Sequence, residues 1–187
     1  MSLKKDIEKS KFLVFLLDED HHIDEVVEVT KSLKNKDSKI CYVCLSRTFD
    51  DVCGDFEKKG MDLKRFYFID VLSSHYGKKK NEKNCLFLDS PTNIQEIKRT
   101  ILTVLKEKKC NTLILDTISA MLVYHDARNI EQFTNDILLE EQNKEKIIYM
   151  AFKHNLCTLP HENEMLINDL NMFADKMIDI SLKKASK

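Results

Sequence analysis

The sequence has few glycines, no surplus of positive charge and no long apolar run. Its 187 residues include only three glycines, Gly54, Gly60 and Gly77. The formal net charge is −1, whereas a dedicated nucleic-acid-binding protein usually carries a basic surplus, so the charge argues against a nucleic-acid partner. No apolar run approaches the ~18 residues of a membrane span, and the N-terminal "MSLKKDIEKSK" contains no apolar signal segment. We therefore expect a cytoplasmic protein with no membrane partner.

The length and the composition favour a single domain. A chain of 187 residues fits one domain, and 43% apolar residues are enough to build a core. The one obvious break is "GKKKNEKN" at residues 77–84, which is polar, basic and without periodicity. We interpret it as a flexible surface loop between two strands, with contact to an anion or a nucleic acid as the alternative. We therefore expect one domain over residues 1–187.

The cysteines are expected to be buried thiols. Six are present: Cys41, Cys44, Cys53, Cys85, Cys110 and Cys157. In a cytosolic protein, free buried cysteines are more common than disulfides. Cys41 and Cys44 form a C-x-x-C within "KICYVCLS", but residues three apart on a strand point to opposite faces. The pair therefore favours core packing over a redox or zinc site.

Short apolar runs alternate with helical patterns along the chain. The expected strands are residues 12–17, 39–46, 65–72, 85–89, 111–118, 146–152 and 176–182. Several are nearly continuous apolar runs, which is typical of strands covered on both faces. Helical patterns occupy residues 23–35, 49–60, 93–109, 127–143 and 163–174. This alternation predicts an α/β fold with three α/β/α layers and a mostly parallel sheet.

The junction from the first strand to the first helix, "FLLDEDHHIDEVVEV" at residues 15–29, is built from acids and imidazoles. A phosphate loop needs G-x-x-x-x-G-K-[ST], because its glycines let backbone N–H groups close on the phosphates. The only Gly-Lys pair is Gly77-Lys78, and lysine follows it. Three carboxylates at the junction would repel a triphosphate, so ATP is not expected as a cofactor. Asp20 or Asp24 is expected to cap the helix.

A phospho-acceptor receiver domain is one alternative. Ligands of open α/β sheets lie beyond the carboxyl ends of the strands. There Asp18 and Asp20, a later Asp116, Ser119 and Lys153 resemble the acid pocket, acceptor, hydroxyl and lysine of such a domain. However, Asp18 and Asp116 are 98 residues apart, whereas units of this size would place the acceptor roughly 40 residues after the first acids.

A metal site is the second alternative. The sequence contains no G-x-S-x-G and no H-E-x-x-H. Asp18, Asp20, His21, His22 and Asp116 are nevertheless all expected at strand ends. Converging carboxylates would suit Mg²⁺ or Mn²⁺, and imidazoles would add affinity for Zn²⁺. A set of Asp18, Asp20, His21 and Asp116 is the metal site to be tested.

Three segments carry a family resemblance. They are "FYFIDVLSS" (66–74), "LILDTISAMLVYHD" (113–126) and "INDLNMFADKMIDISL" (167–182). In this order they resemble the ATPase core of the RecA superfamily, in its archaeal KaiC-like branch, over residues 12–182. The resemblance implies a RecA-like fold, in which Asp116 matches the Walker B aspartate that holds Mg²⁺ through water. A strand-end aspartate can also cap the following turn, here through Thr117 or Ser119.

The departures from that family concern the catalytic groups. The Walker A lysine and its Ser/Thr have no counterpart, and the phosphate-loop position is occupied by Asp18, Glu19, Asp20, His21 and His22. Ser46 and Arg47 stand where active KaiC-like proteins carry a pair of glutamates. Phosphoryl transfer depends on positioning and charge stabilisation, so the loss of these groups implies a protein without ATPase chemistry, catalytic residues or a required cofactor.

The leading hypothesis is therefore a pseudo-ATPase that regulates or scaffolds by binding another protein. Its partner would be a second copy of the chain or an active RecA/KaiC-like paralogue. A divalent-metal or nucleotide-binding protein, with Mg²⁺ or Zn²⁺ as cofactor, and a receiver domain remain alternatives. A nucleic-acid-binding RecA relative is the last, and it rests only on residues 77–84 and the basic segment "KRTILTVLKEKK" at 98–109.

Overall fold

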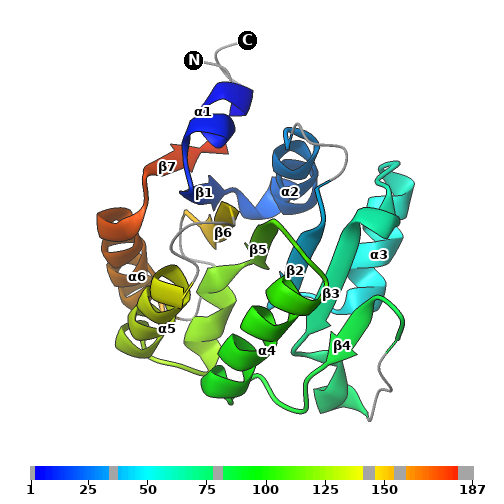
Figure 1. Cartoon of the computed structure of the whole chain (residues 1–187). Helices are drawn as coiled ribbons and strands as arrows, with labels where there is room; N and C mark the ends of the chain where they lie inside the picture. Colours follow the sequence, from blue (N-terminus) through cyan, green and yellow to red (C-terminus); the bar gives the residue numbers. More distant parts are fainter. Residues whose placement is uncertain (1–2, 34–37, 78–81, 141–145, 154–158, 181–187) are drawn as a thin grey trace.

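The computed structural model describes residues 3–33, 38–77, 82–140, 146–153 and 159–180. Its centre is a seven-stranded sheet with the order β4-β3-β2-β5-β6-β1-β7 (Figure 1). The strands are β1 (Phe12–Leu17), β2 (Ile40–Cys44), β3 (Phe66–Asp70), β4 (Cys85–Phe87), β5 (Thr112–Asp116), β6 (Lys146–Phe152) and β7 (Lys176–Asp179). All neighbouring pairs are parallel. Each of the seven expected strands is confirmed.

In the described part of the chain, one α-helix precedes β1 and five others lie in the connections between strands. They are α1 (Leu3–Lys9), α2 (His22–Lys31), α3 (Phe49–Lys58), α4 (Ile94–Glu107), α5 (Ala127–Glu140) and α6 (Pro160–Phe173). Four short 3₁₀ turns also occur, η1 (Glu19–His21), η2 (Leu63–Arg65), η3 (Ser73–Tyr76) and η4 (Ile118–Val123). Helix α1 was not predicted from the sequence, because its seven residues are mostly charged and bury only one apolar side chain, Ile7. Among the described residues, no helix is both long and apolar enough to span a bilayer.

Two apolar clusters make the fold three-layered. On one face of the sheet, α4, α5 and α6 pack Ile101, Phe133 and Leu170 against the strands. On the other face, α1, α2 and α3 contribute residues such as Val29 and Phe56 (Figure 1). Cys41 belongs to the first cluster and Cys44 to the second, which confirms that the C-x-x-C pair is split between the two faces.

The helix ends follow local chemistry. Asn93 caps α4 by accepting a hydrogen bond from the Glu96 N–H at 3.1 Å. Gly60, after α3, has a φ of 68°, the left-handed conformation that glycine adopts without strain. His161 and Glu162 lie in the first turn of α6. Pro160 starts that helix because the first helical residue needs no intrahelical N–H bond. Residues 78–81 of the expected 77–84 loop lie outside the described part.

Candidate functional site

The expected site lies where β1, β2 and β5 reach the carboxyl edge of the sheet. Asp116 is the last residue of β5, and Cys44 of β2 is its neighbour in register. The peptide bond from Asp116 to Thr117 is cis. β1 is separated from β5 only by β6, so the turn that follows β1 is brought near Asp116. This arrangement explains why residues 94 positions apart in the sequence are in contact.

Both carboxylate oxygens of Asp116 are engaged by the protein itself. Oδ1 lies 2.7 Å from Nε2 of His22, and Oδ2 accepts a hydrogen bond from the Tyr42 hydroxyl. Asp116 is 1% exposed. Burial, together with the charge of Asp116, raises the pKa of the Tyr42 phenol well above its usual value. The phenol therefore stays protonated as a donor, and the aspartate is closed off from solvent.

His22, rather than His21, is the histidine that reaches Asp116. It is the first residue of α2, it is buried, and its ring packs edge-on against Phe152 with centroids 5.3 Å apart. Both histidines line a neighbouring hollow, but the contact with Asp116 is made by His22. The sequence contained a signal for this choice: His22, Glu25, Val26 and Val29 have helical spacing and form the buried stripe of α2.

Glu25 is a site residue that sequence reasoning missed. Its side chain is fully buried, and its Oε2 accepts a hydrogen bond from the Asp18 N–H at 2.8 Å. In η1 the His21 N–H donates to the Asp18 carbonyl at 3.3 Å. The Asp20 N–H lies 3.4 Å from the Asp18 carboxylate. The N–H groups of Asp18, Asp20 and His21 are thus directed at groups of the chain. The side chain of Glu19 lies outside the described part.

The expected cap of α2 is wrong. The N-cap residue is His21, and it makes no side-chain capping hydrogen bond. Asp24 lies inside the first turn of the helix and pairs with Lys59 at 2.5 Å. The preceding 3₁₀ turn moves the helix start so that neither Asp20 nor Asp24 occupies the capping position.

The positions expected for catalytic glutamates hold a serine and a paired arginine. Arg47 forms an ion pair with Asp55 of α3. Burial raises the pKa of Asp55, but the hydrogen bond and charge of Arg47, with help from Lys58, hold it below its usual value. Arg47 and Asp55 line the hollow of about 270 Å³ into which His21 also faces. The Ser46 hydroxyl is buried and has no hydrogen-bond partner among the described residues.

Several of the other expected groups have partners elsewhere in the described part of the chain. Within the described ranges, no three His, Cys, Asp or Glu side chains gather in a way that could hold a metal ion. Lys153 pairs with Asp179 at 2.5 Å, and the Ser119 hydroxyl accepts a hydrogen bond from the Phe152 N–H at 3.1 Å. Lys153 and Ser119 thus each have a partner other than Asp116.

Asp70, at the end of β3, has the capping role that was expected of Asp116. Its Oδ1 accepts from the backbone N–H groups of Leu72 and Ser73, both at 2.8 Å. Its Oδ2 accepts from the Phe49 N–H and the Ser73 hydroxyl, both at 2.6 Å. The side-chain partners found for Asp116 are instead His22 and Tyr42. The two strand-end aspartates therefore differ in their partners: Asp70 binds backbone N–H groups, whereas Asp116 binds two side chains.

Comparison with known proteins supports the fold. The structure is similar to the KaiC-like protein PH0186 from the hyperthermophilic archaea Pyrococcus horikoshii OT3, with a TM-score of 0.61 and 12% sequence identity. The match covers 90% of this chain and 70% of that protein. No family model matches the sequence, and no curated protein matches it either. The parallel sheet with helices on both faces is thus a KaiC-like, RecA-type α/β fold.

Proposed function

We propose that this protein is a non-catalytic relative of the RecA-type ATPases that works by binding another protein. In this proposal the junction at residues 18–22 is a degenerate Walker A segment, and Asp116 is a Walker B aspartate converted to a structural group. The chain would act as a regulatory or scaffolding subunit, on a second copy of itself or on an active paralogue. It would need no cofactor.

The engagement of Asp116 carries this proposal. A magnesium-coordinating aspartate must present an oxygen to the ion or to its water shell. Here one oxygen faces His22, the other accepts from Tyr42, and the residue is almost fully buried. Releasing it would leave a buried hydroxyl without an acceptor, which costs about 1–3 kcal/mol. The site therefore favours a closed, structural arrangement over metal binding.

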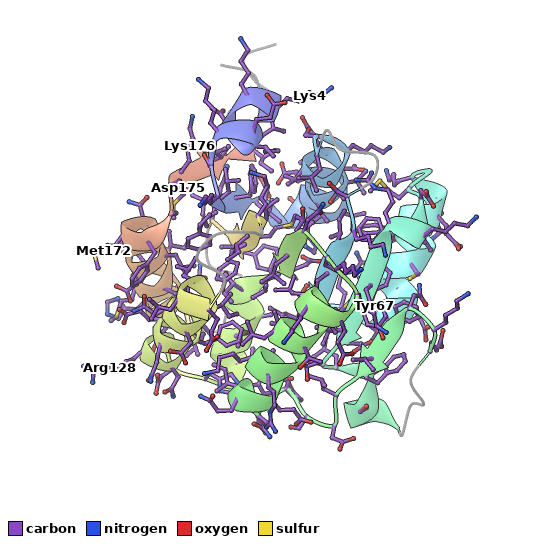
Figure 2. The ribbon with its side chains drawn as sticks, viewed as in Figure 1. Lys4, Tyr67, Arg128, Met172, Asp175 and Lys176 are labelled. Carbon is purple, nitrogen blue, oxygen red and sulfur yellow. The ribbon has the colours of Figure 1, made fainter. Side chains whose placement is uncertain are left out.

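Exposed apolar side chains support the interaction part of the proposal. Met165 and Met172 lie seven residues apart on α6, which places them on the same side of that helix. Met172 is 75% exposed and points away from the body of the molecule (Figure 2). On the adjacent α5, Leu139 is 62% exposed. Methionines on a surface adapt readily to a partner, so we place the protein-binding face on α5 and α6.

Metal binding at Asp116 is tested by titrating Mn²⁺ and following its electron paramagnetic resonance signal. Weak binding by scattered surface acids will be common to all variants. The proposal expects wild type and Asp116→Asn to bind the same amount of Mn²⁺ at every concentration. Extra binding by the wild type that Asp116→Asn removes would contradict it and would support the metal-binding alternative.

Partner binding is tested with Met165→Glu/Met172→Glu. Gln95→Glu/Thr103→Glu is the matched control, because it adds the same charge at exposed positions of another helix. The proposal expects the first variant, but not the control, to lose the self-association or the paralogue complex formed by the wild type in light-scattering chromatography. A wild-type chain that stays monomeric and binds no paralogue, or a complex that survives in both variants, would contradict this assignment of the face.

A further inference from the structure

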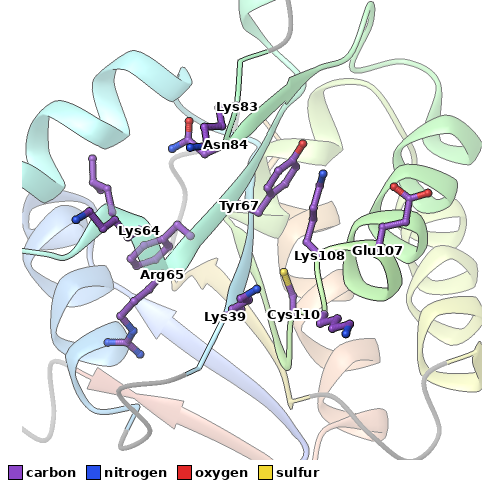
Figure 3. Close-up of a pocket in the computed structure, with 12 residues that line it drawn as sticks. Lys39, Lys64, Arg65, Tyr67, Lys83, Asn84, Glu107, Lys108 and Cys110 are labelled. Atoms are coloured by element: carbon purple, nitrogen blue, oxygen red, sulfur yellow. The ribbon is translucent and has the colours of Figure 1, made fainter.

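A basic hollow opens at the opposite edge of the sheet from Asp116. It has a volume of about 810 Å³ and lies among the segments that enter β2, β3, β4 and β5 (Figure 3). We call it the basic hollow. Six cationic side chains line it: Lys39, Lys64, Arg65, Lys83, Lys108 and Lys109. Glu107 is the one carboxylate residue in its described lining.

The described carboxylates do not neutralise the five lysines. In the described part of the chain, none of them forms an ion pair with a described carboxylate. The ammonium group of Lys108 lies 4.8 Å from the centre of the Tyr67 ring, and the two side chains extend alongside each other in the hollow (Figure 3). Burial raises the pKa of the Cys110 thiol to about 11. The charges of Lys39 and Lys108 oppose this rise, which places both lysines near the thiol. The positive groups thus converge on one region.

A helix dipole explains only part of this cluster. Lys108 and Lys109 follow the C-terminus of α4, where cations are favoured. Three other segments supply Lys39, Lys64 and Lys83. The dipole of α4 does not account for these lysines. Lys109 also has a φ of 54°, and the Cys110 N–H donates to the Leu105 carbonyl at 3.0 Å. This is the helix-terminating position at which glycine is usual, so a cation is present despite backbone strain.

We propose that the basic hollow binds a ligand that carries several phosphate groups. A phosphate monoester has a charge of about −1.5 to −2 at pH 7, so three phosphates come close to balancing the lining. Five carboxylates of an acidic peptide would need five residues, which span about 17 Å when extended. A hollow of about 810 Å³ is only about 9 Å across if its dimensions are equal, a size that suits a small molecule. Lysine binds phosphate as a point charge without the fixed fork of arginine.

The direct test is calorimetric titration of the full chain with inorganic tripolyphosphate at low salt. The variant is Lys39→Gln/Lys64→Gln/Lys108→Gln, and the matched control is Lys4→Gln/Lys5→Gln/Lys106→Gln. The control residues are also exposed and do not line the hollow; Lys4 lies far from Tyr67 (Figure 2). We expect the hollow variant to bind at least about tenfold more weakly, because hydrogen bonds to charged groups are the strong ones. The control should bind like the wild type.

Two further arms identify the source of the phosphates. A nucleoside diphosphate tests a free nucleotide, and a fluorescent single-stranded oligonucleotide tests a nucleic-acid strand, whose affinity would fall steeply with salt. Loss of binding in the hollow variant but not in the control supports the proposal for either source. Asp116→Asn should change none of these affinities, because the hollow is independent of the function proposed above. Circular dichroism melting of each variant shows whether it is folded.

Three results would overturn the proposal. The first is a wild-type chain that does not bind tripolyphosphate. The second is equal binding by the hollow variant and the control, which would mean diffuse attraction to surface lysines. The third is equal binding of a pentaglutamate peptide, because the hollow would then select charge alone and an acidic protein segment would be the better ligand.

Discussion

Replacing Asp116 by alanine should destabilise the protein by about 2–6 kcal/mol. The substitution leaves His22 and the fully buried Tyr42 hydroxyl without their shared acceptor. An unsatisfied buried hydrogen-bonding group costs about 1–3 kcal/mol, and both the hydroxyl and the imidazole lose their partner. Tyr42→Phe removes one donor from the carboxylate and should cost less, about 1–3 kcal/mol.

Urea denaturation followed by far-UV circular dichroism measures both effects, provided that the slope with denaturant stays the same in each variant. Asp136→Ala is a suitable control, because the Asp136 side chain is 32% exposed, far more than Asp116, and pairs with Lys98 at 2.5 Å. A surface pair contributes at most about 1 kcal/mol. The double variant of Asp116 and Tyr42 should show a coupling of about 0.5–3 kcal/mol, as contacting residues do.

The opposite result would refute the reasoning. An aspartate kept for binding a ligand is often a burden on stability, and its removal is then neutral or stabilising. If Asp116→Ala changed the free energy of unfolding by less than about 0.5 kcal/mol, the change would match an ordinary surface substitution. The closed arrangement around Asp116 would then contribute nothing, and the site would have to be considered open to ligands.

Three more predictions concern other parts of the structure. Lys109→Gly should raise the free energy of unfolding by up to about 1 kcal/mol. A non-glycine residue at positive φ costs about 1–2 kcal/mol, and glycine's freedom in the unfolded chain offsets only part of that. A lower free energy of unfolding in urea denaturation would contradict the strain. Arg47→Gln should raise the pKa of Asp55 in an NMR titration, because Arg47 holds it low. In the wild type, Asp55 stabilises the fold above about pH 4 and loses that contribution as the pH falls through its lowered pKa, and an unchanged pKa in the variant would exclude Arg47 as the cause. Because the pKa of Tyr42 is raised, its contribution to stability is complete below about pH 10 and is lost as the pH rises above that value. The alkaline loss of stability should therefore be smaller in Tyr42→Phe. An identical decline in both proteins would show that other groups cause it.

The strands were predictable because they are short apolar runs between polar segments. β1 and β6 have the expected bounds, and the others lie inside their expected segments. The parallel layout followed from the alternation with helices, and the similarity to a KaiC-like structure supports the same fold. The start of α2 was harder to predict, because a 3₁₀ turn occupies Glu19–His21 and the helix begins only at His22. One residue of helical phase then decides which histidine is buried.

The partners of Asp116 depended on that phase and on topology. Tyr42 comes from β2 and His22 from the start of α2, and only the strand order brings them together. Glu25 was visible as an acid within an apolar stripe, which marks a buried polar group that needs a partner. The basic hollow was not predictable from composition, because a net charge of −1 conceals lysines that gather from distant segments.

ATP hydrolysis is the most direct test of the central claim that this fold has lost its catalytic chemistry. The measurement compares phosphate release from ATP and Mg²⁺ by wild type and Asp116→Asn over long incubations, with a chain-free blank. Because Asp116 is held by His22 and Tyr42, both proteins should release no more phosphate than the blank, even if ATP binds in the basic hollow. Hydrolysis by the wild type that Asp116→Asn abolishes would show that the aspartate is catalytic and would contradict the account.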